Sequence, residues 1–72
     1  MSELRYEIDL FWSDEDHAYI AEVPDLAGCM ADGPTYGDAL KAVEIVIQEW
    51  IATAKELGRP IPQPRRRKAA AH

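Results

Sequence analysis

The chain opens with a regular alternation of apolar and polar side chains. From residue 4 to residue 12 the even positions are apolar, and Arg5, Glu7 and Asp9 occupy odd positions between them. A period of two sustained over this length predicts a strand with one buried face. Phe11 interrupts the polar face, and we expect it to contact a loop or a partner.

Two further strands are predicted before the middle of the chain. Residues 13–16 have the composition of a turn, and residues 17–23 are rich in aromatic and β-branched side chains. A connection of this length fits an antiparallel hairpin. Tyr19 and Ile20 are adjacent and both apolar, so the pattern leaves the inward face of this strand open. A short third strand is predicted over residues 29–32, between turns that contain proline and glycine.

A long amphipathic helix is predicted from about residue 35 to residue 57. Its apolar side chains recur every three or four residues and form one stripe. Thr35 and Asp38 have the spacing of a capping box, although Asp replaces the usual Glu or Gln, and Gly58 stands where a C-terminal cap is expected. At 1.5 Å per residue the helix is about 34 Å long, which is more than a three-stranded sheet needs.

These elements predict an α/β fold of the α+β type, a two-layer sandwich in the order β-β-β-α. We expect one domain over residues 1–58, followed over residues 59–72 by a Pro-rich segment and a basic flexible tail. A chain of this size buries only about 60% of its unfolded surface, so we expect association into a homo-oligomer, a dimer or a tetramer. The predicted oligomer interface lies on the helix and consists of Ile45, Trp50 and Ile51. Ile45 lies off the main stripe and is either a stray exposed side chain or part of this contact.

Charge divides the chain into an acidic body and a basic end. The first 58 residues hold all thirteen acidic side chains and only three Lys or Arg, a formal charge of −10. The last 14 residues hold five Lys or Arg and no acid, a formal charge of +5. The body suits a basic partner, whereas the basic end suits phosphates or the acidic body itself.

Candidate chemistry is sparse. Cys29 is the single cysteine, lacks a local His/Asn signature, and is interpreted as a buried thiol. His17 and His72 are far apart, and no Cys/His cluster has zinc spacing, so we expect no metal and no cofactor. The first residues lack a basic region followed by an apolar run, and no apolar stretch approaches about 18 residues. We therefore expect no membrane association and a cytoplasmic location.

One ordered series of residues resembles the HicB-like antitoxins. The similarity extends over roughly residues 5–64, and Ala27 stands where that family often has proline. It is carried by Tyr19-Ile20-Ala21-Glu22-Val23-Pro24-Asp25-Leu26-Ala27-Gly28-Cys29, then Asp32-Gly33, Thr35-Tyr36 and Asp38-Ala39-Leu40.

The resemblance implies a partial RNase H-like fold without nuclease activity. It also implies a partner, a small basic HicA-like toxin that cleaves mRNA and whose active site the antitoxin covers. Many family members carry a C-terminal DNA-binding domain, and we expect none here. From charge we predict that the toxin contacts the acidic strand face and the hairpin tip, through Glu7, Asp9, Asp14, Glu15, Asp16 and Glu22.

Two alternatives to the antitoxin role remain open, and a catalytic role is not expected. The chain could be a small oligomeric nucleic-acid-binding module, because a basic arm contacts phosphates without reading sequence. It could also be an orphan HicB-like scaffold protein with no surviving toxin. An enzyme would need Cys29 or Asp9 for its activity. The residues predicted for nucleic-acid contact are Arg65, Arg66, Arg67 and Lys68.

Overall fold

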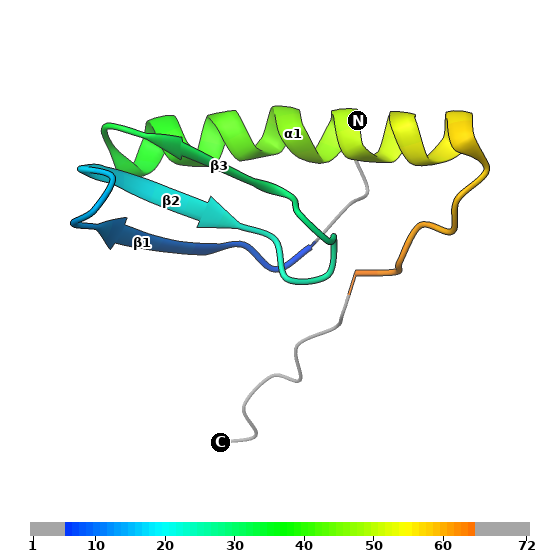
Figure 1. Ribbon diagram of the computed structural model, residues 1–72, viewed down its shortest axis with the longest axis horizontal. Helices are drawn as coiled ribbons and strands as arrows, with labels where there is room; N and C mark the ends of the chain where they lie inside the picture. Colours follow the sequence, from blue (N-terminus) through cyan, green and yellow to red (C-terminus); the bar gives the residue numbers. More distant parts are fainter. Residues whose placement is uncertain (1–5, 65–72) are drawn as a thin grey trace, which may run out of the picture.

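A computed structural model describes residues 6–64 of the chain, which form a three-stranded antiparallel sheet and one long helix. The sheet has the order β1-β2-β3, and α1 lies over one of its faces as a second layer (Figure 1). The predicted α+β sandwich is therefore confirmed, whereas its RNase H-like relationship stays a prediction. The elements are β1 (Asp9–Ser13), β2 (Ala18–Glu22), β3 (Met30–Gly33) and α1 (Tyr36–Leu57).

The β1–β2 hairpin is held by side chains of its own turn. The Trp12 Nε1–H group donates to the Asp14 carboxylate over 2.7 Å. The Ser13 hydroxyl donates to the Asp16 carboxylate over 3.0 Å and accepts from the Asp16 N–H over 3.3 Å. His17 closes the turn with φ of 51°, in the left-handed region that suits the last residue of such a loop. The predicted hairpin is present.

The strand register settles which face of β2 points inward. Leu10, Ala21 and Ala31 form one row across the three strands. Ala21 is completely buried, and Tyr19 packs against the same core, so the odd positions of β2 face α1. Ile20 consequently points to the opposite face. The small side chains of Ala21 and Ala31 let the helix lie close to the sheet.

The first strand is shorter than the alternation predicts. It begins at Asp9 because β2 ends opposite it at Glu22, so residues 6–8 have no strand beside them for pairing. Tyr6 is nevertheless buried, and its hydroxyl donates to the carbonyl oxygen of Pro62. Ile61 also packs against the core, so the Pro-rich segment lies against the body as far as the structure describes it.

The loop between β2 and β3 consists of two consecutive tight turns. The Leu26 N–H donates to the Val23 carbonyl over 3.1 Å, and the Cys29 N–H donates to the Leu26 carbonyl over 3.0 Å. Gly28 has φ of 76°, which places glycine at the third position of the second turn, as a type II turn requires. The Val23 N–H then donates to the Cys29 carbonyl over 3.0 Å and closes the loop on itself.

The helix has the two caps predicted for it. The Thr35 hydroxyl accepts from the Asp38 N–H over 3.1 Å, and Gly58 has the left-handed φ of 70°. Gly33 precedes the helix where a Cβ would lie 2.6 Å from the Ala39 nitrogen, so this close approach needs glycine. No helix among residues 6–64 is long and apolar enough to cross a membrane. The buried face consists of Ala39, Val43, Ile47, Ile51 and Ala54.

Candidate functional site: the acidic sheet face

The face of the sheet turned away from α1 carries both acidic and apolar side chains. Six neighbouring side chains on it form an accessible surface, of which five are exposed and Ile20 is half-buried, whereas α1 lies over the opposite face. Each of the three strands contributes one acidic and one apolar side chain to this surface. We call this surface the acidic sheet face; it consists of Asp9, Phe11, Ile20, Glu22, Met30 and Asp32.

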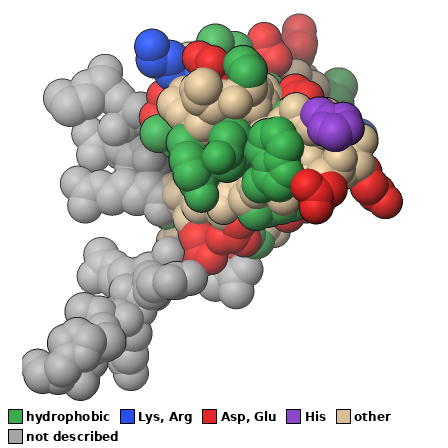
Figure 2. Space-filling view, turned by 90° about the vertical axis from the view of Figure 1, so that its left-hand side faces the viewer, with side chains coloured by type: hydrophobic (Ala, Val, Ile, Leu, Met, Phe, Trp, Pro, Cys, Tyr) green, Lys and Arg blue, Asp and Glu red, His purple; other side chains and the backbone are tan. Residues whose placement is uncertain are grey.

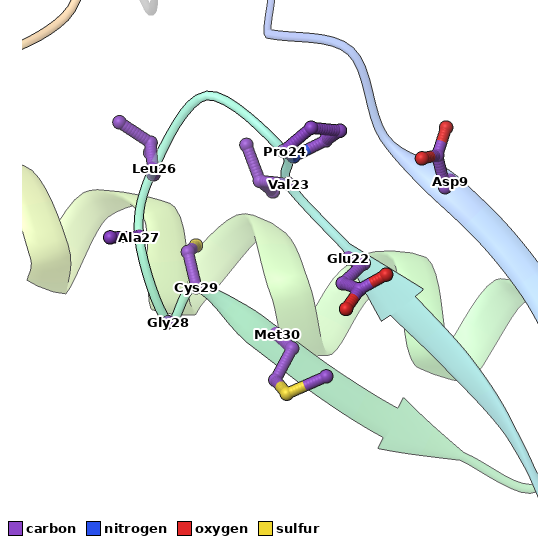
Figure 3. A pocket seen from close by; sticks show the side chains of 9 residues that line it. All are labelled: Asp9, Glu22, Val23, Pro24, Leu26, Ala27, Gly28, Cys29 and Met30. Atoms are coloured by element: carbon purple, nitrogen blue, oxygen red, sulfur yellow. The ribbon is translucent and has the colours of Figure 1, made fainter.

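Two of the predicted toxin-binding residues meet on this face. Asp9 and Glu22 are partners in the β1–β2 register, and Met30 continues their row on β3. They border an open hollow of about 320 Å³ (Figure 3), whose remaining lining comes from the loop over residues 23–29. The hollow therefore combines two carboxylates and a thioether with the residues of this loop. Such a surface suits a cationic group with an apolar stem, as in arginine or lysine.

The loop beside the hollow is fixed from behind by the helix. The Trp50 Nε1–H group donates to the carbonyl oxygen of Ala27 over 2.9 Å. Val23, Leu26 and Cys29 are almost fully buried between this loop and α1. Burial raises the pKa of the Cys29 thiol, which keeps it neutral and unreactive near pH 7. The predicted buried thiol is confirmed, and the loop that borders the hollow is attached to α1 through the Ala27 carbonyl and through its buried side chains.

Tyr6 attaches the end of the described chain to this same region. Its hydroxyl donates to the Pro62 carbonyl, and its ring is buried in the core. Burial, and to a smaller extent the nearby Asp25 carboxylate, raises the pKa of Tyr6. The phenol is therefore neutral at physiological pH and serves as a hydrogen-bond donor.

The three acidic residues of the hairpin tip lie apart from the hollow. They follow β1, whose length separates them from Asp9 by about 13 Å along the strand. Asp14 and Asp16 are bound to Trp12 and Ser13, so their carboxylates have a structural role in the turn. The sequence grouped these acids with Asp9 and Glu22 through charge, whereas the structure places the two groups at opposite ends of the sheet.

The hairpin end also exposes aromatic side chains. Trp12 packs edge-on against Tyr19 with ring centroids 5.1 Å apart, and Tyr19 packs against Tyr36 at 4.3 Å. Trp12 and Tyr36 nevertheless keep about half of their surface exposed. Figure 2, which faces this end, shows hydrophobic side chains gathered on the surface with acidic side chains around them.

The remaining predicted residues lie in three different settings. Glu7 is half-buried in the segment before β1. Ile51 belongs to the core of its own chain, Trp50 is half-buried and bound to the loop, and Ile45 is 58% exposed. The predicted oligomer interface stays a prediction, and only Ile45 presents most of its surface to a partner. The residues predicted for nucleic-acid contact, from Arg65 to Lys68, lie outside the described residues.

Reasoning from the sequence missed Asp32 and the apolar members of the acidic sheet face. Asp32 lies on a strand of four residues, which is too short for its alternation to assign a face. Phe11 gave a usable signal because it interrupted the polar positions of its strand. The pairing of Ile20 with both Phe11 and Asp32 could not be read without the register. Within residues 6–64, no group of three metal-ligating side chains is close enough to hold an ion.

Comparison with known proteins places the chain in a family. A UPF0150 protein of Synechocystis is 36% identical over 44 residues, which cover 61% of this chain and 60% of that protein. A UPF0150 protein of Thermoplasma acidophilum is 29% identical over 69 residues, which cover 96% of this chain and 99% of that protein. No solved structure matches the chain. Residues 1–62 match the family described as UPF0150-like, and the chain belongs to this family.

Proposed function

We propose that this protein is a HicB-like antitoxin that neutralises a small, basic, HicA-like mRNA-cleaving toxin by covering the toxin's active site. UPF0150 proteins are a small family related to HicB, which supports the resemblance seen in residues 19–40. The proposal includes the partial RNase H-like arrangement implied by that resemblance. The role is binding, and catalysis belongs to the partner.

The acidic sheet face is the observation that carries this proposal. Residues 6–64 hold twelve acidic and three basic side chains, a formal charge of −9. A ribonuclease needs a cationic surface to hold the phosphates of its RNA, and an acidic face competes for that surface. The exposed apolar side chains Phe11 and Met30 would add desolvated contact area between the carboxylates.

If the acidic sheet face binds a cationic toxin, the rate and strength of binding should depend on the salt concentration. Complementary charge accelerates encounter and disfavours wrong partners, and its effect falls as salt screens the charges. The complex should therefore form fastest at low ionic strength. It should also be displaced by competing RNA, because both ligands occupy the same cationic surface of the toxin.

The test first searches the reading frames adjacent to this gene for one that encodes a small basic protein, and it then combines that protein with the full chain. The absence of such a reading frame would contradict the antitoxin role. We expect the chain to inhibit RNA cleavage by that protein. The double variant Glu22→Lys/Asp32→Lys should weaken binding by about 10-fold or more at low salt, because it reverses two charges on the acidic sheet face. Calorimetry measures the affinity, and a gel assay of RNA cleavage measures the inhibition.

The control is Glu44→Lys/Glu49→Lys, which makes the same change of charge on exposed positions of the helix. We expect it to retain most of the affinity. Equal losses in the two double variants would mean that only net charge matters, and would contradict docking on the acidic sheet face. A neighbouring basic protein that neither binds the chain nor is inhibited by it would overturn the antitoxin role.

Glu15→Lys examines the hairpin tip separately. It is preferable to a reversal of all three tip acids, because Asp14 and Asp16 hold the turn and their loss would disturb the hairpin itself. If the tip also contacts the toxin, Glu15→Lys should weaken binding at low salt, and unchanged affinity would confine the contact to the sheet face.

A further inference from the structure

Strand β1 is an edge of the sheet and is apolar on both of its sides. Phe11 is 43% exposed on the acidic sheet face, and Trp12 is 46% exposed on the face toward α1. Edge strands normally carry charges, proline or bulges that prevent pairing with another chain. The strand Asp-Leu-Phe-Trp-Ser has one charged residue, at its first position. Among residues 6–64, no strand pairs with its outer edge.

A hydrogen bond in the loop between β2 and β3 shows which backbone groups of β1 point out from the open edge. The Val23 N–H donates across to Cys29, on the β3 side of β2. The N–H and C=O groups of successive residues in a strand point to opposite sides, so those of Ile20 and Glu22 point away from β3 and toward β1. There they bond with the register partners Phe11 and Asp9. The N–H and C=O groups of Leu10 and Trp12 therefore point out from the open edge.

We propose that β1 pairs antiparallel with β1 of a second copy of this chain, about a two-fold axis at Phe11. This register sets Leu10 opposite Trp12 of the partner subunit, and the reverse, so that each pair exchanges two backbone hydrogen bonds. Phe11 meets Phe11 of the partner subunit, and Asp9 faces Ser13 of the partner subunit. The interface is isologous, as a two-fold dimer requires.

The position of the helix favours this edge over the other. Figure 1 shows α1 lying nearest to β3 and farthest from β1. Trp12, on the helix-facing side of β1, keeps 46% of its surface exposed. At the opposite edge, Gly33 of β3 is pressed against the backbone of the helix. Pairing through β1 would join two sheets into one with six strands, and the two acidic sheet faces would become continuous.

Charge and size predict how this dimer responds to conditions. Each described body carries −9, so the two copies repel and added salt should strengthen their association. Binding of a cationic partner should respond to salt in the opposite sense. Because each strand has only five residues, we expect the interface to bury less than the roughly 1,200 Å² of a stable complex, so the dimer should dissociate on dilution.

Sedimentation equilibrium of the full chain over a wide range of concentration tests this proposal without any toxin. We expect a monomer–dimer equilibrium that Phe11→Lys weakens at least tenfold, while Ile45→Lys leaves it unchanged. The two changes are matched, because both replace an exposed apolar side chain and circular dichroism can confirm the fold of each variant. A wild-type monomer at all concentrations, or a dimer lost in Ile45→Lys and kept in Phe11→Lys, would overturn the proposal.

Cross-linking examines the register itself. Phe11 and its symmetry mate form a non-hydrogen-bonded pair, whose Cα atoms lie about 4.5 Å apart, within the range of a disulfide. Phe11→Cys should therefore give a disulfide-linked dimer under mild oxidation. Asp9→Cys is the control, because position 9 lies far from its own mate in this register. Efficient cross-linking through position 9, or none through position 11, would contradict the register. Because the chain is tested alone, this outcome is independent of the antitoxin proposal.

Discussion

The two ends of the sheet differ in how deeply they bury their apolar side chains. At the loop end, where residues 23–29 meet the helix, Leu26 is 1% exposed and Val23 and Cys29 are equally well covered. At the hairpin end, Trp12, Phe11 and Tyr36 keep roughly half of their surface in water. The same small fold thus holds a packed region and an apolar surface that residues 6–64 leave open.

Because of this difference, substitutions at the two ends should affect different quantities, the free energy of unfolding at one end and binding at the other. Burial of apolar area contributes about 25 cal/mol per Å², so the packed loop end supplies stability that the exposed hairpin end does not. The exposed aromatic area at the hairpin end remains for contact with another molecule. Changes at the loop end should therefore reduce the free energy of unfolding, whereas changes on β1 should mainly reduce binding.

The largest expected effect is on Leu26. Leu26→Ala should lower the free energy of unfolding by about 2–5 kcal/mol, because it leaves a cavity in the packed loop end. Urea denaturation followed by circular dichroism measures the change. Leu57→Ala is the matched control, since Leu57 is 58% exposed and its truncation should cost far less. Similar losses in the two variants would remove the distinction between packed and open regions.

The next effect concerns Tyr6, which joins the loop end to the Pro-rich segment. Tyr6→Phe should lower the free energy of unfolding by about 1–2 kcal/mol, because the Pro62 carbonyl loses its donor. The pKa values of Tyr6 and Cys29 are raised above their ordinary values of 10.0 and 9.0. Stability from such groups is complete below the unfolded pKa and is lost as pH rises through the folded pKa.

Stability should therefore fall in the alkaline range, beginning above about pH 9, because the unfolded chain loses the Cys29 and Tyr6 protons more readily than the folded chain does. Denaturation at a series of pH values measures this slope. Tyr6→Phe/Cys29→Ala should have a lower stability that varies less with pH in that range. A slope that is as steep in the double variant would assign the alkaline loss to other groups.

A smaller effect of opposite sign is expected in the hairpin turn. His17 has a left-handed backbone, which costs a non-glycine residue about 1 kcal/mol. His17→Gly should therefore raise the midpoint of thermal unfolding. Glu15→Gly is the control, because it adds chain flexibility at a position without positive φ and should lower the midpoint. A decrease in both variants would argue against strain in the turn.

The smallest expected effect comes from Ala27, at the second position of the turn that ends the loop. Proline is favoured there in a type II turn and restricts the unfolded chain, so Ala27→Pro should add about 0.4–1 kcal/mol to the free energy of unfolding. The carbonyl oxygen that accepts from Trp50 is kept. Ala27→Gly should act in the reverse direction. A destabilising proline would show that the backbone at position 27 differs from that of a type II turn.

Much of the fold could be predicted from local patterns. Alternation in the first strands, the helical stripe and the caps at Thr35 and Gly58 each depend on residues close together in the chain. The length of β1 could not be predicted, because β2 sets where pairing ends. The setting of Trp50 and Ile51 was also hidden, because the covering loop and Ile61 are distant in sequence.

The candidate site was predictable only in part for the same reason. Asp9 and Glu22 were correctly placed together on neighbouring strands, since their hairpin fixes the pairing. The local roles of Asp14 and Asp16 depend on side-chain geometry that charge counting does not contain. The contribution of Met30 and Asp32 depends on the register of a strand that follows two turns. Charge therefore predicted a basic partner, which stays a proposal, whereas the fold was needed to define the surface.

The docking of a cationic partner on the acidic sheet face can be tested most directly by NMR of isoleucine methyl groups. Ile20 lies on this face and Ile45 lies on the exposed side of α1, so one titration compares both surfaces in the same sample. With the neighbouring basic protein added, we expect the Ile20 signal to shift and the Ile45 signal to stay in place. A shift of Ile45 with Ile20 unchanged would contradict the assignment of this face as the binding surface.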